Sequence, residues 1–478
     1  MRRNDLQNFE KLRPAWVITT LGKVLPISYG KGLTKANRVE SGAYPVYGSS
    51  GQLGWHSESL TKKPALIIGR KGSIGQVYYS SSPCWPIDTT YYVEEGEGLY
   101  LPFFHHLLKG IRLGELDKST AVPGLSRDDY DAVDVAIAPL TEQKRIVAEI
   151  EKQFSRLDEA VAGLKRVKAN LKRYKAAVLK AAVEGRLTER WRKEHPNVEH
   201  AEKLLYRILT ERRKKWEQAE LAKMGARGIE PKDDEWKEKY RNPKPVDYEN
   251  YPSLPYGWHW ASTDQLFWFV TSGSRGWAKY YSESGAFFLR IGNLDHDSIT
   301  LDLKDRQRVR PPEGAEGTRT RVEPKDILIS ITADVGMIAV VPEEFEEAFI
   351  NQHIALAKPV SNVESAYIAW YLCSRPGQKQ LHKLQRGATK TGLGLDDIRS
   401  VNIPLPPLEE QSAIISQVEQ RLSIADEIDK GLNANLRRAE RLRQSILKKA
   451  FSGQLVPQAA KGDIVSIQAS SSGSSSDA

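Results

Sequence analysis

The sequence predicts an α+β protein in which two homologous α/β domains are separated by a long antiparallel two-helix coiled coil with pseudo-two-fold symmetry. Three observations lead to this prediction. A 50-residue segment occurs twice, both copies have the apolar spacing of a long helix, and a Gly-, Tyr- and Thr-rich segment with short β-prone runs precedes each copy.

The repeat relates residues 139–188 to residues 407–456. The two segments align without a gap at a constant offset of 268, with 17 identities in 50 positions. A chance match of this length is very unlikely, so the chain contains a duplication.

Both copies are expected to form long helices. Pro139 and Pro407 suit a helix start, and Gly185 and Gly453 suit a helix stop. Between them, apolar residues recur at spacings of three and four over about four heptads, which is typical of a coiled coil. The alternative is two unrelated amphipathic helices, each packed on its own domain. The matched registers favour packing of the helices on each other.

The repeat also divides the rest of the chain. Ala65–Ile68 and Asp326–Ile331 are examples of the β-prone runs that mark the two domains. The expected parts are an N-terminal arm (1–13), a first domain (14–138), a first long helix (139–188), a charged connector (189–255), a second domain (256–403), a second long helix (404–456) and a flexible tail (457–478).

The charge of the chain is concentrated in one place. Of the net charge of +9, the stretch 142–193 contributes 15 Lys and Arg against 7 Asp and Glu. This excludes a uniformly basic DNA-coating protein and favours local contact with nucleic acid. The absence of an 18-residue apolar run and the charged start predict a cytoplasmic protein. Cys84 and Cys373 are too few for a disulfide framework or a CxxC metal site.

No motif for catalysis was found, so the chain is predicted to have no catalytic and no metal-binding residues. It has no P-loop and no Asp/Asn-Pro-Pro-aromatic tetrapeptide of amino-methyltransferases. Asp233–Lys237 has the residue types of a metal nuclease but lies in a polar linker. The alternatives are a catalytic DNA methyltransferase or nuclease with fused recognition domains, and a purely structural coiled-coil scaffold.

A glycine-rich loop is the sharpest binding signal in the first domain. Residues 67–75 predict a strand that leads into a tight loop presenting Arg70, Lys71 and Ser73. Arg can bind guanine edges with two donors, whereas Lys and Ser more often bind phosphate. A solvated surface turn is the alternative. Aligned on Gly75 and Gly336, the second domain has the same frame with other side chains, among them Thr332.

Further candidates lie in a second loop and in an arginine-rich segment. The second loop, 116–124, aligns with 384–392, and Lys118 coincides with Arg386 there, which suits a shared phosphate contact. In 305–310 a strand would put alternating arginines on one face, along a phosphate strand or at a solvated edge. The predicted DNA-binding residues from these segments are Lys118, Ser119, Thr120, Arg306, Arg308, Arg386, Thr389 and Lys390.

The chain resembles the specificity (S) subunits of type I DNA restriction–modification enzymes. The similarity rests on the Pro-Leu-x-Glu-Gln helix heads at 139–143 and 407–411, the Gly-x-Leu helix ends, Tyr47–Gly51 and the Pro-Tyr-Gly-Trp motif at 255–258. It covers essentially residues 14–456.

This resemblance implies a function. The two domains would be target-recognition domains, and the subunit, itself non-catalytic, would read an asymmetric bipartite double-stranded DNA target. It would bind two modification (M) subunits and, through them, restriction (R) subunits. S-adenosylmethionine, ATP and Mg²⁺ would be used by these partners, with no cofactor in the chain itself. The predicted partner-binding residues are Glu142, Gln143, Glu410 and Gln411.

The two long helices would then act as a ruler between two half-sites. From Pro139 to Glu184 a helix rises about 70 Å at 1.5 Å per residue. The basic face of 142–193 would lie along the spanned DNA or against a modification subunit. The target bases and the spacer length do not follow from the sequence.

Overall fold

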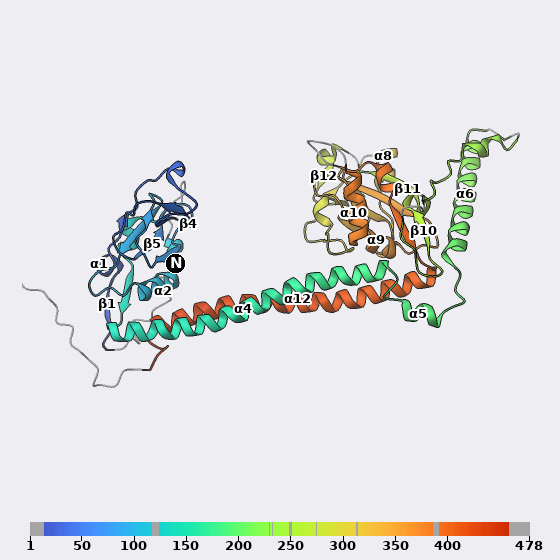
Figure 1. The fold of residues 1–478 in the computed structure, drawn as a ribbon. Helices are drawn as coiled ribbons and strands as arrows, with labels where there is room; N and C mark the ends of the chain where they lie inside the picture. The colour runs from blue at the N-terminus through green and yellow to red at the C-terminus, as the bar shows by residue number, and fades with distance from the viewer. Residues whose placement is uncertain are drawn as a thin grey trace, which may run out of the picture. The chain divides into compact units, whose positions relative to one another are not determined.

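The computed structural model describes residues 14–116, 124–228, 230–231, 233–247, 251–273, 275–311, 314–385 and 392–457. It divides into two compact units (Figure 1). The first unit comprises the chain up to Arg166 and from Gly431 onward, and the second comprises Val167–Lys430. Each unit therefore contains one sheet-rich domain, the start of the long helix that follows it, and the end of the other long helix.

The domain of the first unit contains three small sheets. They have the strand orders β1-β9, β2-β8-β5-β6 and β4-β3-β7, and β3 and β7 pair in parallel. The elements of this domain are β1 (Val17–Thr20), α1 (Leu21–Val24), β2 (Ser28–Tyr29), η2 (Lys35–Asn37), β3 (Tyr44–Gly48), β4 (Gly51–His56), β5 (Ala65–Gly69), β6 (Val77–Ser80), β7 (Trp85–Pro86), β8 (Thr90–Glu94), α2 (Leu101–Ile111), η3 (Leu113–Leu116), α3 (Arg127–Asp131) and β9 (Asp134–Ile137).

The domain of the second unit has the orders β10-β19, β11-β18-β15-β16 and β12-β14-β13-β17, with β13 and β17 parallel. Its elements are β10 (His259–Ser262), α7 (Thr263–Leu266), β11 (Phe267–Ser272), η6 (Trp277–Tyr280), β12 (Tyr281–Ser282), β13 (Ala286–Leu289), η7 (Ile291–Asn293), β14 (Arg308–Val309), α8 (Ala315–Thr320), β15 (Ile327–Ser330), β16 (Ile338–Val340), β17 (Ala348–Ile350), β18 (Ile354–Pro359), α9 (Ser365–Cys373), α10 (Arg375–Leu384), α11 (Leu395–Arg399) and β19 (Asn402–Leu405).

The two domains share one topology. The first and last strands pair antiparallel, a four-stranded sheet follows with the same connectivity, and the remaining sheet contains the parallel pair. The strands that end in the glycine loops, β5 and β15, occupy the same place in their sheets. The predicted mixed α+β fold with two homologous sheet-rich domains and long helices is confirmed.

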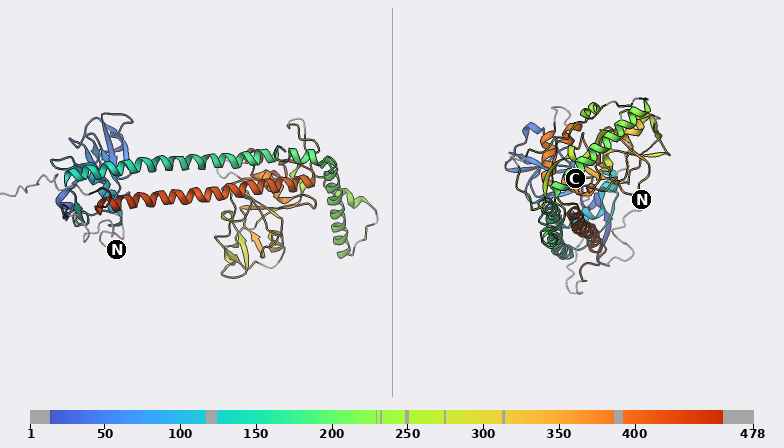
Figure 2. Two further views of the ribbon diagram at one scale, coloured as in Figure 1. Left: turned by 90° about the horizontal axis from the view of Figure 1, so that it is seen from below. Right: turned by 90° about the vertical axis from the view of Figure 1, so that its right-hand side faces the viewer.

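The long helices are α4 (Leu140–Val183) and α12 (Leu408–Phe451), each of 44 residues. Each ends two residues before a glycine with positive φ, +70° at Gly185 and +73° at Gly453, as expected for a helix stop. The two helices lie side by side and antiparallel (Figure 2). In the first unit Arg443 of α12 forms an ion pair with Asp158 of α4, and in the second Lys168 and Asp429 are 3.9 Å apart.

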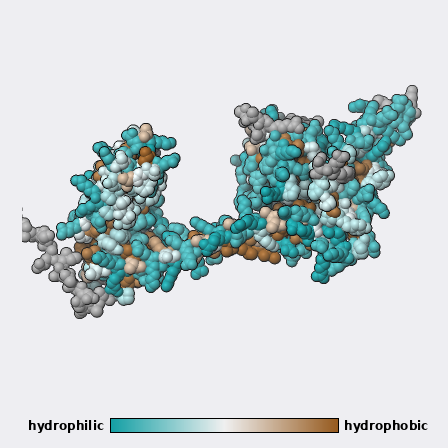
Figure 3. All heavy atoms as spheres, in the orientation of Figure 1, coloured by the Kyte–Doolittle hydropathy of each residue, from teal (hydrophilic) through white to brown (hydrophobic). Residues whose placement is uncertain are grey.

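The apolar register of the helices is only partly buried. One column of the predicted heptad pattern, which includes Val178 and Ala425, packs between the helices. The other column is open to solvent, since Tyr174 is 42% and Ile428 45% exposed. Exposed apolar side chains along α4 and α12 contribute to the apolar strip visible in Figure 3. The prediction of a fully buried two-column seam was wrong, because two helices alone cover only one side of each pattern.

The end of each long helix completes the core of the other helix's domain. Ile446, Leu447 and Phe451 of α12 pack into the core of the first domain, where the Phe451 ring lies 5.4 Å from that of Phe103. In the same way, Val178 and Ala182 of α4 belong to the core of the second domain. Each domain thus folds with helix segments from distant parts of the chain.

The connector contains α5 (Glu189–Glu194), α6 (Ala201–Ala226) and η4 (Glu235–Lys239). The start of α6 is buried on the second domain through Ala201, Leu204 and Ile208. The acidic segment at 233–237 is held by Trp236, which is buried and stacks on Trp216 of α6 with centroids 6.1 Å apart.

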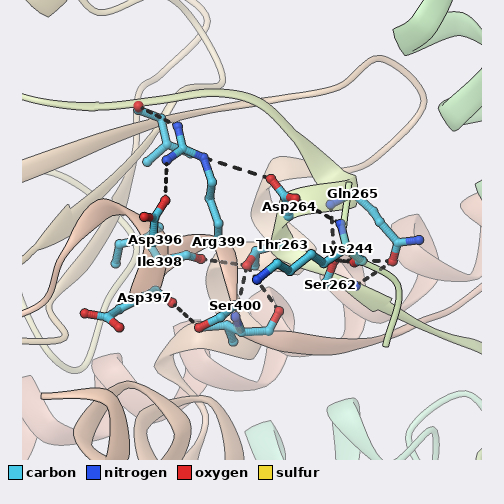
Figure 4. Close-up of polar contacts among 12 residues, drawn as sticks. Lys244, Ser262, Thr263, Asp264, Gln265, Asp396, Asp397, Ile398, Arg399 and Ser400 are labelled. Atoms are coloured by element: carbon cyan, nitrogen blue, oxygen red, sulfur yellow. Dashed lines mark hydrogen bonds and ion pairs between the residues drawn. The ribbon is translucent and has the colours of Figure 1, made fainter. Parts of the chain in front are cut away.

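A polar junction fixes the place where the chain enters and leaves the second domain (Figure 4). Thr263 Oγ1 donates to the carbonyl of Ile398 at 2.6 Å, and Ser262 Oγ donates to the carbonyl of Lys244 at 2.7 Å. The amide of Lys244 in turn donates to Asp264 Oδ2 at 3.0 Å. These bonds tie the end of the connector to strand β10 and, through α11, to the strand that precedes α12.

Candidate nucleic-acid interface

The glycine loops after β5 and β15 have one backbone frame in both domains. The amide of Gly75 donates to the carbonyl of Gly69 at 2.8 Å, and that of Gly336 to Ser330 at 3.1 Å. Gly75 has φ +69°, and a Cβ built on it would lie 2.2 Å from the amide nitrogen of Gly114. The loop therefore requires glycine at this position for both its conformation and its packing.

The glycine loop lies beside the end of the second predicted loop in each domain. Lys71 forms an isolated antiparallel bridge with Gly124, and Thr332 forms the equivalent bridge with Gly392. The structure therefore brings the two predicted binding segments of each domain to one edge. The predicted residues Lys118, Ser119, Thr120, Arg386, Thr389 and Lys390 lie outside the described residues, and their predicted contacts stay predictions.

In the first domain the loop presents two of its three predicted side chains to solvent. Lys71 and Ser73 are exposed, whereas Arg70 is half-buried. The Arg70 guanidinium lies 5.1 Å from the ring centroid of Tyr29 and 5.8 Å from that of Tyr91, and its Nη1 donates to the carbonyl of Asp88 at 3.2 Å. Arg70 is thus held in one orientation, while Lys71 is free to sample solvent.

Tyr91 forms the floor of this arrangement. Its side chain is buried and its hydroxyl donates to the carbonyl of Leu125 at 3.0 Å. Burial, together with the neighbouring Tyr29, raises the pKa of Tyr91 to about 12, although the charges of Arg70 and Arg127 act in the opposite direction. The ring therefore stays neutral beneath the arginine at physiological pH.

The second domain presents different chemistry on the same frame. Thr332 Oγ1 lies 2.5 Å from His353 Nδ1, and the amide of Gln352 lies 3.0 Å from His353 Nε2. Beside them Asp334 contacts His296 Nε2 at 2.8 Å. In place of two cations, this loop offers a carboxylate, an amide and imidazoles, which suit different base edges.

Gln352, His353 and His296 were missed by sequence reasoning. The segment before β18 is equivalent to the segment before β8, because the amides of Ile331 and Arg70 donate to the carbonyls of His353 and Thr89. That equivalence has an offset of 264 residues, whereas the helices have 268 and the glycine loops 261. A gapless repeat search cannot align these segments, so no sequence signal would have found them.

The arginine-rich segment of the second domain does not form the predicted row. Strand β14 contains only Arg308 and Val309, and Arg308 pairs with Glu346 and donates to the carbonyl of Gly285 at 3.0 Å. Arg306 precedes the strand and donates to the carbonyl of Leu303 at 3.2 Å. The interpretation of these arginines as a phosphate track on one strand face was wrong, because the strand is too short and Arg308 is neutralised within the domain.

The helix heads are buried rather than presented to a partner. Glu410 and Gln411 have zero exposure, and Glu142 and Gln143 are at most 7% exposed. The Gln143 amide donates to the carbonyl of Ala138 at 2.8 Å, and Gln411 makes the equivalent bond to Pro406 at 3.0 Å. Their burial leaves no surface for the direct partner contact predicted for these four residues, because their side chains fix the helix starts inside the chain.

Two searches over the described residues concern other classes of site. In that part of the chain, no three His, Cys, Asp or Glu residues converge as metal ligands would. No helix there has the length and apolar character needed to cross a membrane.

Comparison with known families gives the chain its relatives. The family model described as the type I restriction modification DNA specificity domain matches residues 15–171 and 317–438, more than half of the chain. The chain belongs to this family. The identification made from the helix heads and helix ends is therefore confirmed.

Individual relatives agree with this assignment to the specificity family. The chain is similar to the type I restriction enzyme EcoBI specificity subunit of Escherichia coli, with 26% identity over 82% of this chain and 74% of the relative. It is also 23% identical to the EcoKI specificity subunit of Escherichia coli K12, over 94% and 91% of the two chains. A solved structure reported for complex assembly and conformational transition of the type I R-M system shares the fold, with a TM-score of 0.60, 18% identity, and 93% and 99% coverage.

Proposed function

We propose that this chain is the sequence-specificity subunit of a type I restriction–modification complex and reads a bipartite double-stranded DNA target with its two domains. The observation that carries the proposal is the pair of glycine loops, which have one backbone frame and unlike side chains. Equivalent positions with different chemistry are what the recognition of two different half-sites requires. Membership of the specificity family supports the same function.

The chain itself is proposed to be non-catalytic. Its sequence lacks the nucleotide-binding and amino-methyltransferase motifs, and its relatives are specificity subunits. Methyl transfer from S-adenosylmethionine and the use of ATP and Mg²⁺ would then be carried out by modification and restriction subunits. The chain would contribute the choice of sequence and the cytoplasmic complex its chemistry.

The open apolar column of α4 and α12 supports docking of modification subunits on the paired helices. Tyr174 and Ile428 are large, apolar and exposed, and both follow the heptad spacing of the buried column. A helix from a partner could cover this column and complete a bundle. Since the helices are duplicated, the proposal includes two modification subunits per chain.

The experiment combines the purified chain with modification subunits, S-adenosylmethionine and genomic DNA, and maps the methylated bases. The lone chain should transfer no methyl groups, and the mixture should methylate sites that share one two-part motif. Replacing 14–138 with the matching segment of another family member should then change one half of the motif only. Turnover by the lone chain, or methylated sites without a common motif, contradicts the proposal.

A further inference from the structure

A half-exposed tyrosine in the first domain lies beneath two guanidinium groups. The Tyr29 ring, 52% exposed, has Arg70 Cζ at 5.1 Å and Arg127 Cζ at 5.9 Å from its centroid. Tyr91 meets the same ring edge-on at 5.1 Å. Cations at these distances from an aromatic ring are attracted by its negative face. The three side chains come from β2, the glycine loop and α3, and they converge beside exposed Lys71.

Both guanidinium groups are also fixed by backbone carbonyls. Arg70 donates to Asp88, and Arg127 donates to Ile27 and lies 3.8 Å from Asp131 Oδ2. Within the described part of the chain, Asp88 is the one hydrogen-bond acceptor of the Arg70 guanidinium. Its remaining N–H groups can therefore donate to a ligand without breaking a bond of the fold.

The second domain replaces every member of this cluster at once. The strand register equates Tyr29 and Tyr91 with Ser272 and Ala355, because each couple is directly paired between equivalent strands. The loop frame equates Arg70 with Ile331, and the starts of α3 and α11 equate Arg127 with Leu395. Since the backbone is kept without these side chains, the fold does not require the cluster.

We infer that Tyr29, Arg70 and Arg127 form one specificity-determining unit of the first domain. The tyrosine ring and Arg127 are positioning residues, and they hold the Arg70 guanidinium so that it donates two hydrogen bonds to a guanine edge of the first half-site. Arg is suited to this contact because its parallel donors match guanine O6 and N7. A side chain that is already oriented loses less conformational entropy on binding. The inference rests on the proposed function and assigns a base to one of its half-sites.

The test uses the full chain assembled with modification subunits and a library of duplexes with randomised positions. The wild-type complex first selects its two-part target. Tyr29→Ser, which introduces the residue of the second domain, should weaken binding to that target by about tenfold or more and remove the preference for guanine at one position. Arg70→Ile should do the same. The double variant should bind within twofold of Arg70→Ile, because the ring acts only through the arginine.

Three variants separate this role from a structural one. Tyr29→Phe keeps the ring and should retain wild-type selectivity. Ser272→Ala, at the equivalent position of the second domain, should change neither half-site. Arg127→Leu offers a second way to disturb the unit if Tyr29→Ser does not fold.

Several outcomes overturn the inference. They are a retained guanine preference in Tyr29→Ser or Arg127→Leu, an equal loss in Tyr29→Phe, and additive effects in the double variant. A uniform loss over all sequences would assign the unit to phosphate binding and overturn it as well. A wild-type complex that selects no sequence at all overturns the proposed function itself, which distinguishes the two failures.

Discussion

The indole Nε1 of Trp258 donates a hydrogen bond of 2.9 Å to Oε2 of Glu410, and it joins the beginning of the second domain to the head of the helix that leaves it. The same carboxylate accepts from Thr188 Oγ1 at 2.7 Å and from Arg192 Nη2 at 2.7 Å. Glu410 therefore connects three segments that are far apart in the chain. Its side chain has zero exposure, so no solvent replaces a lost partner.

Replacing this carboxylate should destabilise the second unit. Glu410→Ala leaves the charge of Arg192 and the indole of Trp258 buried without their acceptor. Removing one partner of a buried ion pair costs about 3–5 kcal/mol. The expected result is a clear fall in the urea midpoint of the transition that reports the second unit, measured on the full chain.

The neighbouring Glu409 is the matched control for this prediction, because it occupies the same helix turn but is exposed. Glu409→Ala removes one charge near the helix dipole and should cost less than about 1 kcal/mol. Equal midpoints for the two variants would show that the buried network does not stabilise the unit.

The stability of the first unit should fall in mild acid because of two histidines on α2. Burial, together with the charge of Lys109, lowers the pKa of His105 to about 3 and of His106 to about 4. In the unfolded chain their pKa returns to about 6.5. Between pH 6.5 and 4 the unfolded state therefore binds more protons, so stability is full above pH 6.5 and is lost as the pH falls.

Thermal unfolding of the full chain at several pH values between 7.5 and 4.5 measures this effect. The double variant His105→Gln/His106→Gln should show a smaller loss of midpoint in acid than the wild type. His195→Gln, which changes an exposed histidine of the connector, should keep the wild-type slope. The comparison of slopes also cancels Asp326, whose pKa burial raises to about 6 and which acts with the opposite sign. Parallel slopes in all three proteins would contradict the assignment to α2.

The open apolar column of the long helices should be needed for assembly but not for folding. Tyr174→Glu and Ile428→Glu place a charge where the proposed partner helix packs, and both positions are already exposed in the chain. Each variant should keep the wild-type unfolding midpoint within about 0.5 kcal/mol. Each should bind modification subunits at least tenfold more weakly, as measured by sedimentation. Ser416→Glu, on an exposed face of α12, serves as the control, and equal binding by all three would remove the column as a docking surface.

The helices and the duplication could be predicted from the sequence because their signals are local. A gapless repeat needs no knowledge of loop lengths, and Gly185 and Gly453 stop their helices through a conformation that glycine adopts readily. The exposure of Tyr174 could not be predicted. A heptad pattern records every apolar contact a helix makes, whether the contact lies within the chain or with a partner.

The candidate site was predictable only where the backbone carried the signal. The frame around Gly75 follows from glycine spacing, and the structure confirms its match with Gly336. The role of Tyr29 was hidden, because β2 is 41 residues before Arg70 and only the pairing of β2 with β8 brings the two together. Glu410 was interpreted as a surface residue since it lies in a polar helix head, whereas Trp258 and Arg192 bury it.

The length of the paired helices should set the spacing between the half-sites. Four residues inserted after Ala169 of α4, and again after Arg437 at the equivalent position of α12, lengthen both helices by about 6 Å at 1.5 Å per residue. Four residues are close to one turn, so the buried column can re-form on nearly the same face. A lengthening of 6 Å corresponds to nearly two base pairs at 3.4 Å each. The methylated motif should keep both half-sites and gain one or two base pairs of spacer.

Insertion into one helix only is the control for this prediction. It shifts Lys168 relative to Asp429, or Asp158 relative to Arg443, and so breaks the register of one helix against the other. Such a variant should unfold at a lower urea concentration, whereas the double insertion should not. Mapping of methylated sites in cells that carry the double insertion measures the spacer directly. A folded, active double variant with an unchanged spacer would mean that the helices do not determine the distance, because their length would then have changed without effect on the DNA that is read.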